Sequence, residues 1–200
     1  MIRLYGDKRS GNCYKIQLLC ELLALDYQWI DVDILAKETQ TPEFLALNPN
    51  GKIPLLVDDD GWCLSESNAI LNYLAASSDY LPVDAKSLAK VQQWQFFEQY
   101  SHEPYIAVAR YIQLYLGLPD DKVAEYNAKH QGGYKALDVM EDQLAKTAFI
   151  AGEHCTVADL SLYAYTHVAH QGGFDLANYP NIRQWFTRIE TLPGYVAMEN

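Results

Sequence analysis

The chain has 200 residues, of which 50% are apolar, enough for a sizeable core in one large or two small domains. Its 15 basic and 26 acidic side chains give a net charge of −11, which disfavours binding to nucleic acid. Apolar runs stay well short of the ~18 residues that a membrane span needs, and the N-terminus lacks the pattern of a secretory signal. We therefore expect a cytoplasmic protein with no membrane partner.

Short strand and helix signals alternate over residues 1–78. IRLY predicts a strand, GDKRSGN a loop, and the apolar spacing that follows an amphipathic helix. YQWIDVDI predicts a second strand, which a crossover helix would place parallel to the first. After a polar segment, IPLLV and WCLS flank a DDDG turn that suits an antiparallel hairpin. A helix from about Glu66 to Ala76 completes the order β-α-β, a loop or short helix, then β-β-α.

Strand signals cease at SSDYLPVDAKS, and we interpret residues 79–87 as an inter-domain linker. Only helical patterns follow. The first helix should bend or break near Pro104, because proline removes a backbone donor and clashes with the preceding turn. Thr156 and Asp159 have the spacing of a capping box at a helix start. Within an all-helical domain over residues 88–200, the predicted helices are 88–116, 119–146, one after Thr156, and 181–192.

Two features between Asn48 and Ser67 predict a peptide-binding site. Pro54 opens an apolar strand, and because proline cannot donate to a sheet ladder it should lie at a strand end, where a cis bond is one option. Free N–H groups and the helix dipole at Ser67 favour a carboxylate. A bound peptide would then pair with the backbone of Ile53 and be held at one end by Ser67.

The order of these elements resembles the thioredoxin fold, and with its helical second half the chain resembles a cytosolic glutathione S-transferase of the bacterial serine type, theta- or beta-like. The motifs that carry the resemblance are TPEFLALNPNGKIPLL, SESNAILNYLA and TVADLSLY, in this order. The resemblance implies an α/β thioredoxin-like N-terminal domain, an all-α C-terminal domain and a homodimer.

The resemblance also implies glutathione as the co-substrate. Ile53, next to a cis Pro54, would offer its backbone to the cysteinyl part of glutathione. Glu66 would hold the amine of the γ-glutamyl group, and Ser67 its carboxylate. Lys52 resembles the position that contacts the glycyl end, although an ordinary exposed lysine is the alternative.

The catalytic position falls on Ser10, where serine-type transferases carry the hydroxyl that activates the thiol. Asn12 is a second candidate donor to the sulfur, with a role in the local backbone as the alternative. Tyr5 is a rival activator, but a residue inside IRLY is expected to be packed. The segment Ser10-Gly-Asn-Cys13 is a C-x-x-C motif without its first cysteine, so a dithiol mechanism is not expected. Cys13 should be a buried or half-buried small residue at the helix start rather than a nucleophile.

The acceptor substrate is expected between the domains, beside the first long helix, with Tyr105 and Arg110 as its candidate contacts. An aromatic stripe of this spacing is also typical of a core. No metal site is predicted from the spacing of the cysteines and histidines. The leading hypothesis is a detoxifying transferase that directs the glutathione thiolate to a small electrophilic, partly apolar molecule. The alternatives are a glutathione-dependent disulfide or peroxide reductase and a non-catalytic interaction module.

Overall fold

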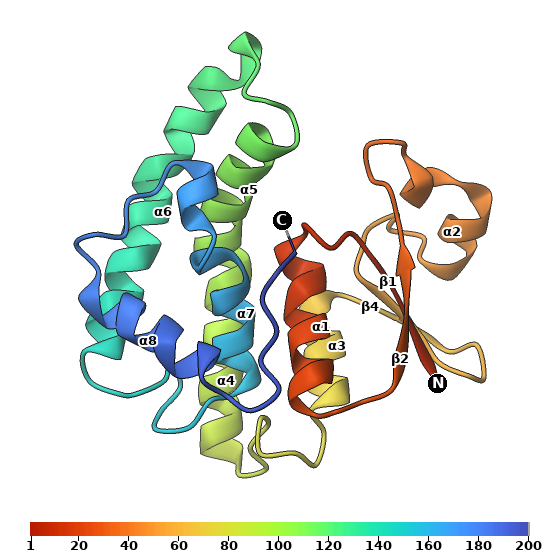
Figure 1. The fold of residues 1–200 in the computed structure, drawn as a ribbon, viewed down its shortest axis with the longest axis horizontal. Coiled ribbons are helices and arrows are strands. Elements are labelled where there is room, and N and C mark those ends of the chain that lie inside the picture. Colours follow the sequence, from red (N-terminus) through yellow and green to blue (C-terminus); the bar gives the residue numbers. More distant parts are fainter. Residues whose placement is uncertain (200) are drawn as a thin grey trace. The chain divides into compact units, whose positions relative to one another are not determined.

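The computed structural model describes residues 1–199, which form two compact units (Figure 1). Unit 1 comprises Met1–Ala76 together with the C-terminal segment from Leu192 on, and unit 2 comprises Ser77–Thr191. The units differ from the expected domains in two respects. The last segment packs with the first unit, and a helix already begins at Ala85, within the expected linker over residues 79–87. No helix of the described part is long and apolar enough to cross a membrane.

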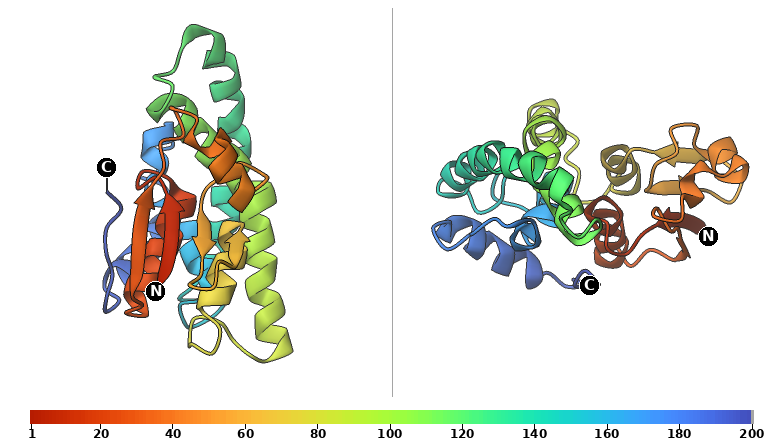
Figure 2. Two further views of the ribbon diagram at one scale, coloured as in Figure 1. Left: turned by 90° about the vertical axis from the view of Figure 1, so that its right-hand side faces the viewer. Right: turned by 90° about the horizontal axis from the view of Figure 1, so that it is seen from above.

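Unit 1 is built on a four-stranded sheet of order β2-β1-β3-β4. β1 is parallel to β2 and antiparallel to β3, and β3 is antiparallel to β4. α1 and α3 pack side by side on one face, and α2 lies beyond the other (Figures 1 and 2). This architecture confirms the thioredoxin-like prediction. The elements are β1 (Ile2–Gly6), α1 (Gly11–Leu22), β2 (Tyr27–Asp31), η1 (Glu38–Gln40), α2 (Pro42–Leu47), β3 (Leu55–Val57), β4 (Cys63–Ser65) and α3 (Ser67–Leu74).

The strand register brings three loops to one edge of the sheet. Leu55, at the start of β3, pairs with Tyr5 near the end of β1 and with Ser65 at the end of β4. The loop after β1, the loop before β3 and the start of α3 therefore meet at the same edge. These are the loops that carry the predicted site residues.

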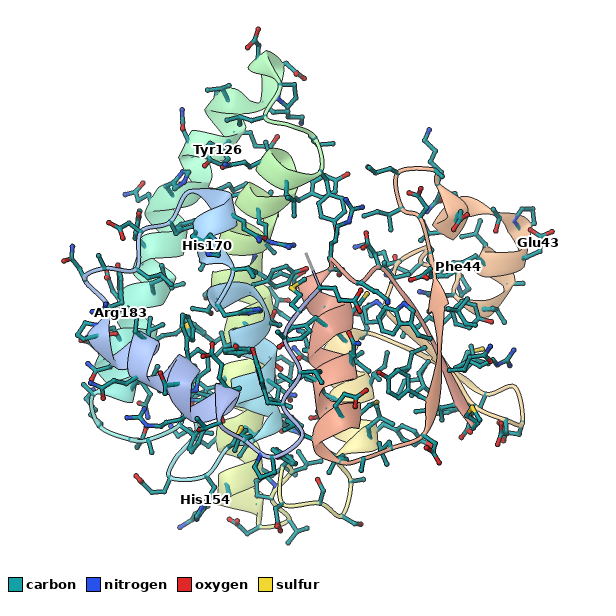
Figure 3. The ribbon with its side chains drawn as sticks, viewed as in Figure 1. Glu43, Phe44, Tyr126, His154, His170 and Arg183 are labelled. Atoms are coloured by element: carbon teal, nitrogen blue, oxygen red, sulfur yellow. The ribbon has the colours of Figure 1, made fainter. Side chains whose placement is uncertain are left out.

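The second face of the sheet is closed by α2. Phe44 is 6% exposed and packs against Leu55 and Val57 of β3. Figure 3 labels Phe44. Its ring meets the Tyr5 ring edge-on, with the ring centroids 6.3 Å apart. Burial of a phenylalanine of this kind stabilises a fold by about 1.5–3 kcal/mol, so α2 fixes the polar segment that leads to β3.

Unit 2 is helical, as predicted. The expected disturbance near Pro104 is a π-helical turn, η2, after which the chain continues as α5 with proline in its first turn, where no N–H is required. Every residue of α7 is buried, and its capping box is present. The elements are α4 (Ala85–Phe97), η2 (Glu98–His102), α5 (Glu103–Leu114), η3 (Asp120–Lys122), α6 (Val123–Leu144), α7 (Val157–Thr166), η4 (Ala169–Gly172) and α8 (Pro180–Glu190).

Candidate active site

Ile53 and Pro54 stand immediately before β3, and the peptide bond between them is cis. The backbone N–H and C=O groups of Ile53 make no hydrogen bond with any other residue that the structure describes. The loop behind them is braced by side chains: Asn48 Nδ2 donates to the Lys52 carbonyl at 2.7 Å, and Gln40 Nε2 donates to the Gly51 carbonyl at 3.1 Å. A pair of free backbone groups is thus held in place on a supported loop.

Glu66 and Ser67 begin α3 at the same edge of the sheet. Glu66 is exposed and has a φ of 69°, a left-handed value that a non-glycine residue adopts at a cost of about 1 kcal/mol or more. Ser67 is 6% exposed, and its hydroxyl donates to Asn12 Oδ1 at 3.1 Å. This hydrogen bond joins the start of α3 to the first turn of α1. The first N–H groups of α3 have no intrahelical acceptor, and the helix dipole gives this end a partial positive charge.

Ser10 is the N-cap residue of α1 and is partly buried. Its N–H donates to the Asp7 carbonyl at 2.9 Å, and its own carbonyl accepts from the Tyr14 N–H at 2.9 Å. The hydroxyl does not accept from the N–H groups of α1, unlike the side chain of a typical N-cap serine. It lies beside the sulfur of Cys13.

Cys13 is a buried structural thiol. It is 0% exposed, and burial raises its pKa to about 12, although the hydrogen bond with the Ser10 side chain acts in the opposite direction. A thiol with this pKa is protonated at neutral pH and is a poor nucleophile. The prediction that Cys13 is buried is confirmed.

The remaining candidates of unit 1 take different positions. Lys52 is exposed on the braced loop, next to Ile53. Tyr5 packs with Phe44 in the core cluster beneath α2, as expected for a residue inside the first strand. The structure therefore gathers Ser10, Asn12, Lys52, Ile53, Pro54, Glu66 and Ser67 on the loops and helix starts at one sheet edge.

Tyr105 and Arg110 both belong to α5 of unit 2 but have different surroundings. Tyr105 lines a cavity of about 160 Å³ together with residues of α4, η2 and α6. Arg110 is 2% exposed, and its Nε donates to Gln171 Oε1 at 2.7 Å, which fastens η4 to α5. Arg110 is not among the residues that line the cavity of Tyr105. Their contact with an acceptor stays a prediction, with Tyr105 on a cavity wall and Arg110 enclosed.

Asn48 and Gln40, the residues that brace the loop before Ile53, were not predicted from the sequence. The role of Asn48 could have been inferred from its place in an Asn-Pro-Asn-Gly run, because asparagine in such a turn commonly forms hydrogen bonds with nearby backbone groups. Gln40 gave no such signal, since its partner lies eleven residues away. Over residues 1–199, no three side chains of His, Cys, Asp or Glu are grouped so that they could hold a metal ion.

Comparison with known proteins identifies the family to which the chain belongs. The family described as the glutathione S-transferase N-terminal domain matches residues 1–76, and the glutathione S-transferase C-terminal domain matches residues 96–193. The chain belongs to the glutathione S-transferase family. The resemblance inferred from the motifs is thus confirmed.

Relatives of the chain match over nearly its full length. A glutathione S-transferase structure from Pseudomonas fluorescens Pf-5 is 59% identical with a TM-score of 0.98, covering 100% of this chain and 99% of that one. Glutathione S-transferase 3 of Zea mays is 33% identical, over 97% of this chain and 91% of its own. The disulfide-bond oxidoreductase YfcG of Escherichia coli is 31% identical, over 97% of this chain and 92% of its own.

A further structure, of a glutathione transferase family member from Pseudomonas fluorescens Pf-5, has two glutathione molecules bound. It is 25% identical with a TM-score of 0.84 and covers 96% of this chain and 89% of that one.

Proposed function

We propose that Ser10 activates glutathione by donating its hydroxyl hydrogen bond to the sulfur, and that the thiolate then attacks a small electrophilic, partly apolar molecule in a detoxifying conjugation. The observation that carries this proposal is the Ser10 hydroxyl, which stands at the N-terminus of α1 and does not cap it. This hydroxyl hydrogen-bonds the Cys13 thiol, and in the proposal it turns from that sulfur to the sulfur of a ligand that approaches the helix start.

The energy required for activation is within reach of these groups. A thiol with a pKa near 8.5 is only a few per cent ionised at neutral pH, and lowering its pKa by two units requires about 2.7 kcal/mol. A hydrogen bond to a charged group contributes about 1.5–3 kcal/mol, and a helix N-terminus adds about 0.3–1 kcal/mol. Ser10 and the start of α1 together supply a stabilisation of this size.

The rest of the sheet edge would hold the tripeptide. In this proposal the Ile53 backbone beside Pro54 pairs with the cysteinyl residue. The Glu66 carboxylate binds the γ-glutamyl amine, and Ser67 with the first N–H groups of α3 binds its carboxylate. Asn12 supports this arrangement through its hydrogen bond with the Ser67 hydroxyl at 3.1 Å.

Several finer points belong to the proposal as well. The exposed ammonium group of Lys52 would lie near the glycyl carboxylate, an attraction of up to about 1 kcal/mol in solvent. Tyr105, and Arg110 through its hold on η4, would shape the acceptor side. The working form would be a cytoplasmic homodimer, as is usual for proteins that resemble this one.

The test is to replace Ser10 by alanine and by threonine. We expect Ser10→Ala to lower kcat about 10²-fold and to abolish the ultraviolet thiolate band of bound glutathione at pH 7, because the hydrogen bond to the sulfur is lost. Ser10→Thr keeps the hydroxyl and should retain most of both. Unchanged turnover and an unchanged thiolate band in Ser10→Ala would show that another group activates the thiol.

A second reaction, glutathione-dependent reduction of a disulfide, is favoured by the relative from Escherichia coli that is named a disulfide-bond oxidoreductase. Two glutathione thiols would be oxidised to glutathione disulfide while the substrate disulfide is reduced. Assays with one aryl halide and one small disulfide, on the same preparation, rank the two reactions. A higher kcat/KM for the disulfide would replace conjugation as the proposed reaction.

A further inference from the structure

The C-terminal segment of unit 1, residues 192–199, runs along α1 without forming a helix or a strand (Figure 1). We call it the C-terminal strap. It begins beside the C-terminal end of α1, where Gly194 has a φ of 86° and a Cβ would meet the Glu21 carbonyl oxygen at 2.8 Å. Only a glycine fits this close approach without displacement. The strap is therefore seated on the helix rather than trailing from the chain.

Near the first turn of α1, the strap is joined to the residue that follows the catalytic loop. The Tyr14 side chain is fully buried, and its hydroxyl donates to the Val196 carbonyl at 2.8 Å. The backbone N–H of the same residue donates to the Ser10 carbonyl at 2.9 Å. Tyr14 thus connects the strap directly to Ser10, the N-cap residue of α1.

The end of the strap reaches the loop itself. Glu199 forms an ion pair with Lys8, with a distance of 3.1 Å between Oε1 and Nζ. The two residues line an open hollow of about 370 Å³, which Asp7 and Arg9 also line. The pair is partly exposed and contributes little by itself, so the buried Tyr14 contact is the main attachment.

We propose that the C-terminal strap positions Ser10, with Tyr14 as the positioning residue that transmits its effect. The order of contacts supports this role, because the strap passes from the end of α1 to its first turn and then to the loop before Ser10. A hydrogen bond from a hydroxyl to a sulfur depends strongly on direction and distance. A loosened loop would therefore weaken the activation of the thiol. This inference rests on the proposed role of Ser10.

The strap should affect turnover more than the binding of glutathione. Ile53, Glu66 and Ser67 lie on the loop before β3 and at the start of α3, and within residues 1–199 none of them forms a hydrogen bond or ion pair with the strap. Their hold on the tripeptide should persist when the strap is released. The expected signature is a fall in kcat per folded enzyme, with a nearly constant KM for glutathione and a raised pKa of the bound thiol. A general loss of folded protein would lower the apparent kcat but leave that pKa unchanged.

The experiment compares Tyr14→Phe, a chain that ends at Tyr195, and the matched control Tyr27→Phe. The Tyr27 hydroxyl donates to Glu21 Oε1 at 2.8 Å, so its removal also deletes a hydrogen bond to α1, but at the end of the helix far from Ser10. We expect Tyr14→Phe and the shortened chain to lower kcat about three- to tenfold and to raise the pKa of the bound glutathione thiol. KM for glutathione should stay within about twofold, and Tyr27→Phe should change neither quantity.

Hydrogen exchange supplies a measurement that does not depend on the role of Ser10. Amides of residues 8–14 should exchange faster in Tyr14→Phe than in the wild type, and those of α3 at an unchanged rate. Unchanged exchange at residues 8–14 overturns the strap proposal even if Ser10→Ala proves inactive. Faster exchange with an unchanged thiol pKa and kcat also overturns it, because the strap would then hold the loop without serving the reaction. If the shortened chain does not fold, Tyr14→Phe decides alone.

Discussion

Asp159 is a wholly buried carboxylate that joins three segments of the helical unit. It accepts hydrogen bonds from the Ile150 N–H at 2.7 Å, the Thr156 N–H at 2.9 Å and Trp185 Nε1 at 2.9 Å. Burial raises its pKa to about 6, although the hydrogen bonds act in the opposite direction. The capping box at the start of α7 is therefore also a titrating group inside the fold.

Because folding raises the pKa of Asp159, its contribution to the stability of the folded protein decreases as the pH rises. An aspartate in an unfolded chain has a pKa near 3.9, so between about pH 4 and 6 the folded protein holds a proton that the unfolded chain has lost. The stabilisation due to Asp159 should be complete below about pH 4 and should decrease as the pH rises through 6. We expect the free energy of unfolding of the wild type, minus that of Asp159→Asn, to fall by about 1–3 kcal/mol from pH 4 to pH 7.

Denaturant titrations at several pH values measure this difference. Asp142→Asn, on the exposed side of α6, is the matched control for the loss of one surface carboxylate. A difference for Asp159→Asn that stays constant or grows toward pH 7 would mean that the hydrogen bonds outweigh burial.

At the scale of elements, the packing of α5 on α6 depends on a glycine. Gly132 lies in the middle of α6, and a Cβ at this position would overlap the ring of Tyr105 on α5. In an open helix, replacing glycine by alanine stabilises by about 0.5–1 kcal/mol. Here we expect Gly132→Ala to lower the free energy of unfolding by about 1–3 kcal/mol, because the helices must separate or the ring must move.

A double-mutant cycle separates the overlap from other effects. In a Tyr105→Ala background the ring is absent, and Gly132→Ala should then be neutral or stabilising. If Gly132→Ala is equally destabilising in both backgrounds, the contact with Tyr105 is not the cause.

The elements themselves were largely predictable because their signals are local. The hairpin at Asp60-Gly61, the strand opened by Pro54 and the cap at Thr156 each depend on residues that are neighbours in sequence. The π-helical form of the turn before Pro104 was not predicted, since a proline signals a disturbance but not how the backbone accommodates it. The hydrogen bonds of Gln40 and Asn48 to the loop before Ile53 were not predicted either, because their acceptors are backbone carbonyls whose position is defined only by the fold.

At the scale of the whole molecule, the packing of the C-terminal residues with unit 1 was not predicted from the sequence. The segment after Thr191 was expected in the helical domain, but it has no periodicity and its partners on α1 lie more than 170 residues earlier. Contacts at such separation are decided by the tertiary structure. Every residue proposed to hold glutathione lies in unit 1.

A ligand that binds only the folded protein stabilises it by mass action. At ten times its dissociation constant, glutathione should raise the free energy of unfolding by about 1.4 kcal/mol, which for a chain of this length corresponds to a shift in Tm of about 3–6 °C. Glu66→Gln should lose most of this shift, because the γ-glutamyl amine loses its charged partner. Ser10→Ala should keep it, because the hydroxyl acts on the sulfur and not on the ends of the tripeptide. Calorimetric scans of the three proteins over a series of glutathione concentrations measure these shifts. Loss of the shift in Ser10→Ala, with its retention in Glu66→Gln, would reverse the assignment of binding and activation between the two residues.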